Sequence, residues 1–261
     1  MCLVVVAWQA HPRFPLVIAA NRDEFHARAA APADFWPQQP QLLAGRDLQA
    51  GGTWLGVDGS RRVGVITNFR DLARPRRHAP SRGGFIPDFL GGRASAAEFL
   101  DRVEVDAPAY AGFSLLLADA SGLWIASNRA EPFARRLNPG IYGLSNHLLD
   151  TPWPKLLRVR AGFTSWLAGL SDANEPELEP VFSLLADRRP AETSPDLLGG
   201  LPPEWATALS SPFVNHEGYG TRCTTVLLGD SAGVLQFRER RFDTQGAIAG
   251  ESEFRLDGNV I

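Results

Sequence analysis

The chain has 261 residues, of which 44% are hydrophobic, and a net charge of -3 at pH 7. Its length and composition can bury a sizeable core, and we expect a single domain over residues 1–261. Because the arginines are scattered among acidic residues, the sequence does not favour a nucleic-acid partner or a membrane surface. Apolar runs such as 16–20 are much shorter than the roughly 20 residues of a membrane-spanning helix, so we expect no membrane span.

The amino terminus has no basic segment followed by an apolar stretch of the signal-peptide type, so we expect a cytoplasmic protein with reduced cysteines. Two cysteines, Cys2 and Cys223, are too few for a disulfide framework or a four-cysteine zinc site, and the five histidines are isolated. We therefore expect no structural metal.

Strands are predicted at the start of the chain. The first two, 3–8 and 16–20, flank a connection marked by Pro12 and Pro15. Further strands are expected at 51–57, 61–69, 113–119, 122–128, 221–230, 234–242 and 252–257. Asp-Gly and Ser-Gly dipeptides between several of them are typical of hairpins, so the sheets are expected to be largely antiparallel.

Helices are predicted in two blocks between the strands. Ser95 and Glu98 have the spacing of a capping box, which begins a short helix. Thr151 as the cap and Pro152 as the first helical residue begin the second block, and apolar residues continue at helical spacing through 178–185. A short helix is expected near 204–209. The order of strands, helices and strands predicts an α+β protein whose helices cover sheet faces.

Cys2 is the first candidate for chemistry. Removal of Met1 would leave a thiol and an α-amino group on one residue, and an amine with a pKa of about 7.7–8.0 can accept the proton of a thiol with a pKa of about 8.5. The alternative is a small apolar residue that begins a strand, as free cysteine often is.

The segment Asn21-Arg22-Asp23-Glu24 is expected just beyond the second strand. If the first two strands are antiparallel neighbours, Arg22 and Asp23 reach Cys2, where Asp23 would hold the α-amine and Arg22 the thiolate. At about 4 Å and an effective dielectric near 20 such a charge is worth roughly 4 kcal/mol, at most about 3 pK units, so Cys2 would be substantially ionised. The alternative is a solvated turn. Glu24 has no assigned role.

Three further polar residues stand in apolar settings: Asn68, Asn146 and Arg222. Amide groups at strand ends, as at Asn68 and Asn146, could donate to the oxyanion that forms when a thiolate attacks a carbonyl, although each alone also suits a turn. Arg222 enters a β-branched strand. If its side chain points to a site, that of Cys223 points away, and we interpret Cys223 as a core residue.

Several blocks of sequence together resemble one family. They are Cys2, AANRDEF at 19–25, GGTWLG at 51–56, TNFR at 67–70, YGLSN and TPWPK within 142–155, and GYGTRCTTV at 218–226. In this order they resemble the NRDE family, also called the transport and Golgi organisation family, over nearly the whole chain. That family is similar to cysteine N-terminal nucleophile hydrolases such as penicillin V acylases and bile salt hydrolases. The resemblance implies an α+β fold of four layers, αββα, with two antiparallel sheets between helical layers.

The same resemblance implies a reaction and roles for the residues. A mature N-terminal Cys2 would attack a small-molecule amide or acyl substrate and form a thioester acyl-enzyme, without a cofactor. Arg22 and Asp23 would support it, although they are adjacent here and spaced apart in the acylases. The implied set is completed by Asn21, Asn68 and Asn146, which would hold the substrate or the oxyanion, and by Arg222 as a late active-site arginine.

The family has also been linked to haem movement and to acyl-CoA or lipid metabolism, so the resemblance also implies an alternative, a non-catalytic carrier that uses the same cleft. The residues that could ligate haem are Cys2, His11, His26, His78, His147 and His216. Those that could meet the phosphates of acyl-CoA are Arg70, Arg74, Arg76 and Arg77.

Overall fold

The computed structural model describes residues 2–71, 79–171, 175–191 and 201–257. The chain divides by its internal contacts into two compact units, and neither is continuous in sequence. The first unit is formed by residues 1–27, 139–145 and 150–255, and the second by residues 28–138, 146–149 and 256–261. The chain therefore passes from one unit to the other several times.

The first unit contains an antiparallel sheet of seven strands in the order β10-β1-β2-β12-β13-β14, with β11 paired to β12. Its strands are β1 (Cys2–Trp8), β2 (Leu16–Phe25), β10 (Gly140–Leu144), β11 (Asn215–His216), β12 (Tyr219–Gly229), β13 (Leu235–Phe242) and β14 (Ile248–Leu256). The predicted antiparallel pairing of the first two strands is confirmed. The short β10 and β11 are absent from the sequence prediction.

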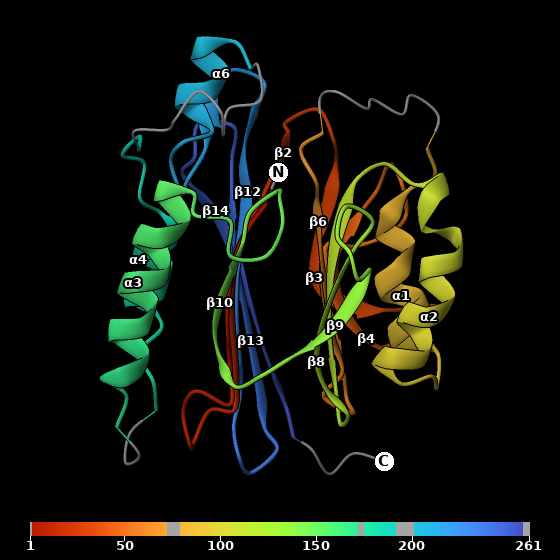
Figure 1. Ribbon diagram of the computed structural model, residues 1–261. Coiled ribbons are helices and arrows are strands. Elements are labelled where there is room, and N and C mark those ends of the chain that lie inside the picture. The colour runs from red at the N-terminus through yellow and green to blue at the C-terminus, as the bar shows by residue number, and fades with distance from the viewer. Residues whose placement is uncertain (1, 72–78, 172–174, 192–200, 258–261) are drawn as a thin grey trace. The chain divides into compact units, whose positions relative to one another are not determined.

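Two helices of the first unit, α3 (Pro154–Ala168) and α4 (Glu179–Leu185), lie along one face of its sheet (Figure 1). They pack against alternate residues of three strands, namely Leu3, Val5, Ala7, Val17, Ala19, Val226 and Leu228. The predicted start of α3 is two residues early, because Pro154 and not Pro152 takes the first helical position, after Trp153 as the cap. The short helix expected near 204–209 is α6 (Pro203–Ala208).

The second unit contains the other antiparallel sheet, in which each strand pairs with its neighbours in sequence. Its strands are β3 (Ala30–Trp36), β4 (Gln39–Asp47), β5 (Leu55–Asp58), β6 (Val63–Asn68), β7 (Phe113–Asp119), β8 (Gly122–Ser127) and β9 (Ala134–Leu137). The sequence pattern does not predict β3, β4 or β9. Exposed polar residues interrupt the apolar alternation in β3 and β9, so neither has the pattern of a half-buried strand.

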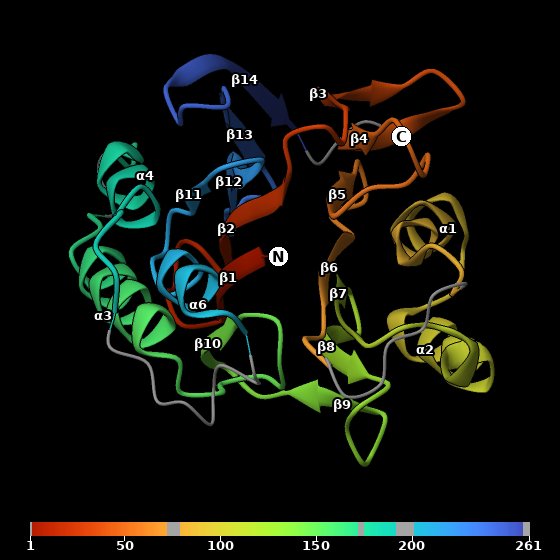
Figure 2. The same cartoon turned by 90° about the horizontal axis from the view of Figure 1, so that it is seen from above.

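Helices α1 (Phe85–Gly91) and α2 (Ala96–Asp106) cover one face of the second sheet, and Figure 2 shows both beside β5 to β8. A 3₁₀ turn precedes α1 (Arg82–Gly84) and another follows α2 (Ala107–Ala109). The predicted capping box is confirmed, since the Ser95 hydroxyl accepts from the Glu98 N–H and the Glu98 carboxylate accepts from the Ser95 N–H at 2.9 Å. The core between helices and sheet includes Leu42, Ile66, Ile86, Phe89, Leu100, Leu115, Leu117 and Ala126.

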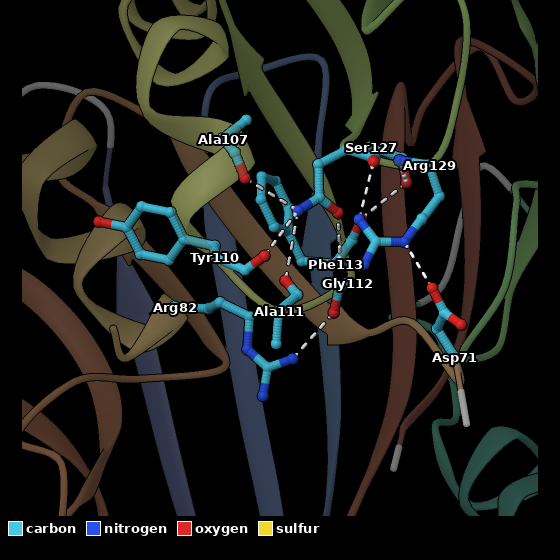
Figure 3. A network of polar contacts seen from close by, with 10 residues as sticks. Asp71, Arg82, Ala107, Tyr110, Ala111, Gly112, Phe113, Ser127 and Arg129 are labelled. Atoms are coloured by element: carbon cyan, nitrogen blue, oxygen red, sulfur yellow. Dashed lines mark hydrogen bonds and ion pairs between the residues drawn. The ribbon is translucent and has the colours of Figure 1, made fainter. Parts of the chain in front are cut away.

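The side-chain amide of Asn128 joins the end of the α2 segment to β7. Its partners Ala107, Tyr110 and Phe113 are labelled in Figure 3. Its Nδ2 donates to the carbonyls of Ala107 at 3.1 Å and Tyr110 at 3.3 Å. Its Oδ1 accepts from the N–H of Phe113 at 3.0 Å. One amide thereby bonds the backbone on both sides of the 107–112 segment, which fixes how this segment enters the sheet.

The α+β class and the two antiparallel sheets with their helices are therefore confirmed. No helix among the described residues is long and apolar enough to cross a membrane. In the same part of the chain, no group of three or more His, Cys, Asp and Glu residues is placed to hold a metal ion.

Candidate functional site

Arg22 lies between the two cysteines on one face of the first sheet. Cys2 in β1 pairs directly with Arg22 in β2. On the other side of β2, Arg22 pairs with Cys223 in β12. Directly paired residues of antiparallel strands project to the same face, so the three side chains form a row across three strands. Arg22 is buried, with 4% of its surface exposed.

The NRDE segment is part of a strand and not a turn. The prediction that the second strand ends at Ala20 is wrong, because β2 continues to Phe25. The reason is β12, which pairs with β2 from Gly229 opposite Leu16 to Tyr219 opposite Phe25 and supplies hydrogen-bond partners along the whole length. β12 lies about two hundred residues further along the chain, so the local sequence pattern around β2 does not show this pairing.

Asp23 projects to the opposite face from Arg22, since successive strand residues alternate. Its Oδ1 accepts a hydrogen bond of 2.7 Å from the Thr221 hydroxyl, and its carbonyl accepts one of 3.0 Å from the Tyr219 hydroxyl. Burial raises the pKa of the Asp23 carboxyl, while the charges of Lys155 and Arg22 lower it. The side chain of Asp23 therefore faces the α3 side, with the Lys155 charge acting on it.

The pKa of the Cys2 thiol shifts in the direction opposite to the one that the sequence predicts. Burial raises the pKa of Cys2, and the Asp23 carboxylate adds to the rise. The charge of Arg22 and a backbone hydrogen bond from Asp23 act in the opposite direction but do not reverse it. Dehydration of the sulfur thus outweighs the nearby guanidinium, and the pKa of the Cys2 thiol is raised.

Asn21 makes its hydrogen bonds within the protein. Its Nδ2 donates to the carbonyls of Leu185 at 2.8 Å and Pro212 at 3.0 Å, and its Oδ1 accepts from the Thr224 hydroxyl at 2.6 Å. With 1% of its surface exposed, Asn21 ties β2 to the end of α4 and to β12. These contacts tie the Asn21 amide into the protein, and its role in substrate binding stays a prediction.

The two other asparagines lie together in the second unit. Asn146, which is 1% exposed and has φ of 55°, donates from Nδ2 to the carbonyl of Asn68 at 2.9 Å. Its own carbonyl accepts from the N–H of Arg70 at 2.7 Å. Asn68 is the last residue of β6, as predicted, and it is exposed. The bond from the Asn146 amide to the backbone of Asn68 is a feature that spacing in sequence does not show.

Arg222 occupies a β-bulge in β12. The register with β2 shifts between Thr221, opposite Asp23, and Cys223, opposite Arg22. A bulge breaks the alternation of side chains, so Cys223 shares the face of Cys2 instead of pointing away from it. Cys223 is nevertheless buried, with 4% of its surface exposed, and its prediction as a core residue is confirmed. Burial, and then the charge of Arg222, lower the pKa of His26, so the guanidinium of Arg222 is close enough to affect the His26 imidazole.

Several residues of the site are absent from the sequence predictions. Lys155 is 3% exposed, and Glu239 is 2% exposed and hydrogen-bonds Cys223. Thr221 and Tyr219 are the hydroxyl donors to Asp23. The sequence signal for Lys155 is its position in the first turn of α3 between apolar residues, where a charged side chain is rarely buried without a partner.

Three candidate haem ligands make ring contacts within their own units. His11 lies 5.5 Å from Phe14, His147 lies 4.6 Å from Phe69, and His216 is stacked 4.5 Å from Trp205, between ring centroids. The Nδ1 of His11 also accepts from two backbone N–H groups. The proposed ligands His78, Arg74, Arg76 and Arg77 lie outside the described residues.

The fold and the site define an α+β protein of two antiparallel sheets with Cys2 paired to a buried arginine. The family model for Transport and Golgi organisation 2 matches residues 1–244. The chain is 31% identical to the Transport and Golgi organization 2 homolog of Mus musculus, over 98% of this chain and 99% of the relative. It is 33% identical to the homolog of Bos taurus with the same coverage. The chain belongs to the Transport and Golgi organisation 2 family, as its motifs predict.

Among solved structures, the chain is similar to a Caenorhabditis elegans ortholog of N-acylethanolamine-hydrolyzing acid amidase. The TM-score is 0.44 and the sequence identity 14%, over 87% of this chain and 92% of that chain. A likeness of this size assigns neither an activity nor a substrate to this chain.

Proposed function

We propose that this protein is a Cys2-dependent hydrolase of acyl amide C–N bonds in small molecules. The observation that carries the proposal is the direct pairing of Cys2 with the buried Arg22. A buried guanidinium opposite a thiol stabilises negative charge on sulfur at the moment of attack, which is when that charge is needed. The resemblance to cysteine N-terminal nucleophile hydrolases supports the same assignment.

The raised pKa of Cys2 decides how the proton must move. A neutral thiol needs a base, and after removal of Met1 the α-amine of Cys2 is that base. The amine takes the thiol proton, the sulfur attacks the carbonyl carbon, and the C–N bond breaks as the leaving amine receives the proton. Water then attacks the thioester, releases the carboxylic acid and restores the thiol.

The remaining residues have supporting roles in this proposal. Asp23, held by Thr221 and Tyr219, orients the α-amine through its backbone and its charge. Arg222 supplies a further positive charge.

The experiment has two parts, mass spectrometry of the purified protein and alkylation with iodoacetamide. We expect Met1 to be absent and Cys2 to be labelled before the buried Cys223. The rate of labelling at Cys2 should still be rising above pH 9, because burial raises its pKa. The matched control is Cys223→Ala, which should leave the labelling of Cys2 unchanged.

Two results would contradict the proposal. Retention of Met1 would leave an amide nitrogen beside the thiol and remove the base. Undiminished turnover of an acyl amide by Cys2→Ala would show that sulfur is not the nucleophile.

The alternative from the sequence analysis is a non-catalytic carrier of haem or acyl-CoA. Titration with haem tests it, since ligation by Cys2 or His26 would shift the Soret band, and Cys2→Ala or His26→Ala would abolish the shift. The ring contacts of His11, His147 and His216 give these three imidazoles other roles, which favours the hydrolase.

A further inference from the structure

A cavity of about 310 Å³ lies within the second unit, and none of the candidate site residues lines it. Its walls come from β7, β8, β9, the turn between β8 and β9, and residues 148–149. Leu115, Leu117 and Ala126 pack against the helices, so the alternate residues Ser114 and Ile125, which line the cavity, project to the other face of the sheet. The cavity is therefore on the face that α1 and α2 leave uncovered.

Arg129 offers a fixed positive group to this cavity. Its Nε donates to the Asp71 carboxylate at 2.8 Å and its Nη1 to the Asn128 carbonyl at 2.9 Å, contacts that Figure 3 draws. Within the described residues its Nη2 makes no hydrogen bond, so one edge of the guanidinium is available to a ligand. Because the other nitrogens hold the group in place, little side-chain entropy is lost when an anion binds.

A second arginine lines the same cavity. Arg135 in β9 pairs with Ile125 in β8, and both line the wall. The side chain of Arg135 makes neither an ion pair nor a hydrogen bond with any described residue. Glu131 also lines the cavity, and Asp71 forms an ion pair with Arg129, so two carboxylates accompany the two arginines. Because no described carboxylate pairs with Arg135, the cavity favours one further carboxylate and disfavours two.

The rest of the wall is apolar, with Ile125, Phe133 and Leu148 among its residues. Ligand cavities span roughly 300–1,000 Å³, so this one holds a small molecule and not a long chain. We propose that it binds a small monocarboxylate with an apolar body, the carboxylate on Arg129 and Arg135 and the body on the apolar wall. The proposal does not depend on the hydrolase activity of Cys2.

The test uses 3-phenylpropanoate as the probe and isothermal titration calorimetry of the full chain. The uncharged 3-phenylpropanamide has nearly the same shape and lacks the carboxylate. We expect the carboxylate to bind and the amide to bind at least about tenfold more weakly, because it loses charge-assisted hydrogen bonds to the arginines.

Two variants test whether the probe binds in this cavity. Arg135→Ala should weaken binding of 3-phenylpropanoate by about tenfold. Arg136→Ala removes the same charge from the neighbouring residue, which pairs with Trp124 and projects to the opposite face, and should leave binding unchanged. Equal effects of the two variants, equal binding of acid and amide, or no binding at millimolar concentration would overturn the proposal. Circular dichroism checks that both variants are folded, and Cys2→Ala should bind the probe normally.

Discussion

Arg22 and Asp23 are neighbours in sequence but act on opposite sides of β2. Arg22 shares its face with Cys2, whereas Asp23 accepts from Thr221 on the face that α3 and α4 cover. Adjacent positions on a strand are the simplest way to place two charges on two faces. Their adjacency therefore places the two side chains on opposite faces of β2.

The first prediction concerns Thr221, whose hydroxyl donates to Asp23 and accepts from the N–H of Val214 at 2.9 Å. Thr221→Val removes both bonds and leaves a buried N–H without its acceptor, so we expect the free energy of unfolding to fall by about 1–3 kcal/mol. Urea denaturation measures it. The control is Thr225→Val on the same strand, which is also buried and whose hydroxyl makes no hydrogen bond within the described residues. An equal loss in both variants would contradict the assigned role.

The second prediction concerns pH and His147. Burial, and then the charge of Arg70, lower the pKa of His147. Between its folded and unfolded pKa values the unfolded chain binds more protons, so the free energy of unfolding decreases as pH falls below about 6.5. His147→Gln should reduce this decrease below about pH 6.5. Thermal unfolding across that range measures it. Identical profiles for wild type and His147→Gln would refute the prediction.

At the scale of elements, β2 is an inner strand paired on both sides. It carries the polar segment because β1 and β12 satisfy its backbone, while Thr221 and Thr224 satisfy two of its polar side chains. A buried strand can hold Asn, Arg and Asp only when such partners exist. The strand, and not a loop, positions the groups opposite Cys2.

The third prediction concerns the GGTW block, where the chain before β5 touches the turn before α1. A Cβ on Gly52 would lie 2.3 Å from the carbonyl carbon and oxygen of Gly83. The backbone must move to admit it, so we expect Gly52→Ala to lower the free energy of unfolding by about 1–3 kcal/mol or more. Gly59→Ala is the control, because no atom lies within 4 Å of its added Cβ. Chemical denaturation compares the two variants, and equal stabilities would disprove the steric account.

At the scale of the whole molecule, each unit is assembled from separate stretches of chain. The first sheet needs β10, whose residues lie between two stretches of the second unit, and the second unit includes residues 146–149, which lie between two stretches of the first. When one unit unfolds, the short segment that it flanks in sequence loses its anchors, and the other unit loses that segment. The single domain expected over residues 1–261 stays a prediction that can be measured.

The fourth prediction is that the two units unfold together. Hydrogen exchange followed by mass spectrometry in rising urea should show peptides from β2 and from β7 losing protection at the same concentration. The exposed strand β14 is a useful reference, because its fraying should appear earlier. Loss of protection in β7 well before β2, or the reverse, would show that the units are independently stable.

Local sequence determined much of this protein. The turn with two prolines determined the first hairpin, and with it the pairing of Cys2 with Arg22. The spacing of Ser95 and Glu98 determined a capped helix. The order of the motifs determined the family. These features depend on neighbours within a few residues or on blocks that can be matched one by one.

Only the tertiary structure decided the rest. β12 turned the NRDE segment into a strand, the bulge at Arg222 put Cys223 on the face of Cys2, and burial raised the pKa of Cys2 despite Arg22. The Asn21 amide donates a hydrogen bond to the end of α4, and the Asn146 amide donates one to the carbonyl of Asn68. Each of these features depends on partners far away in sequence or on burial away from water. A local pattern of residues shows neither the distant partners nor the degree of burial.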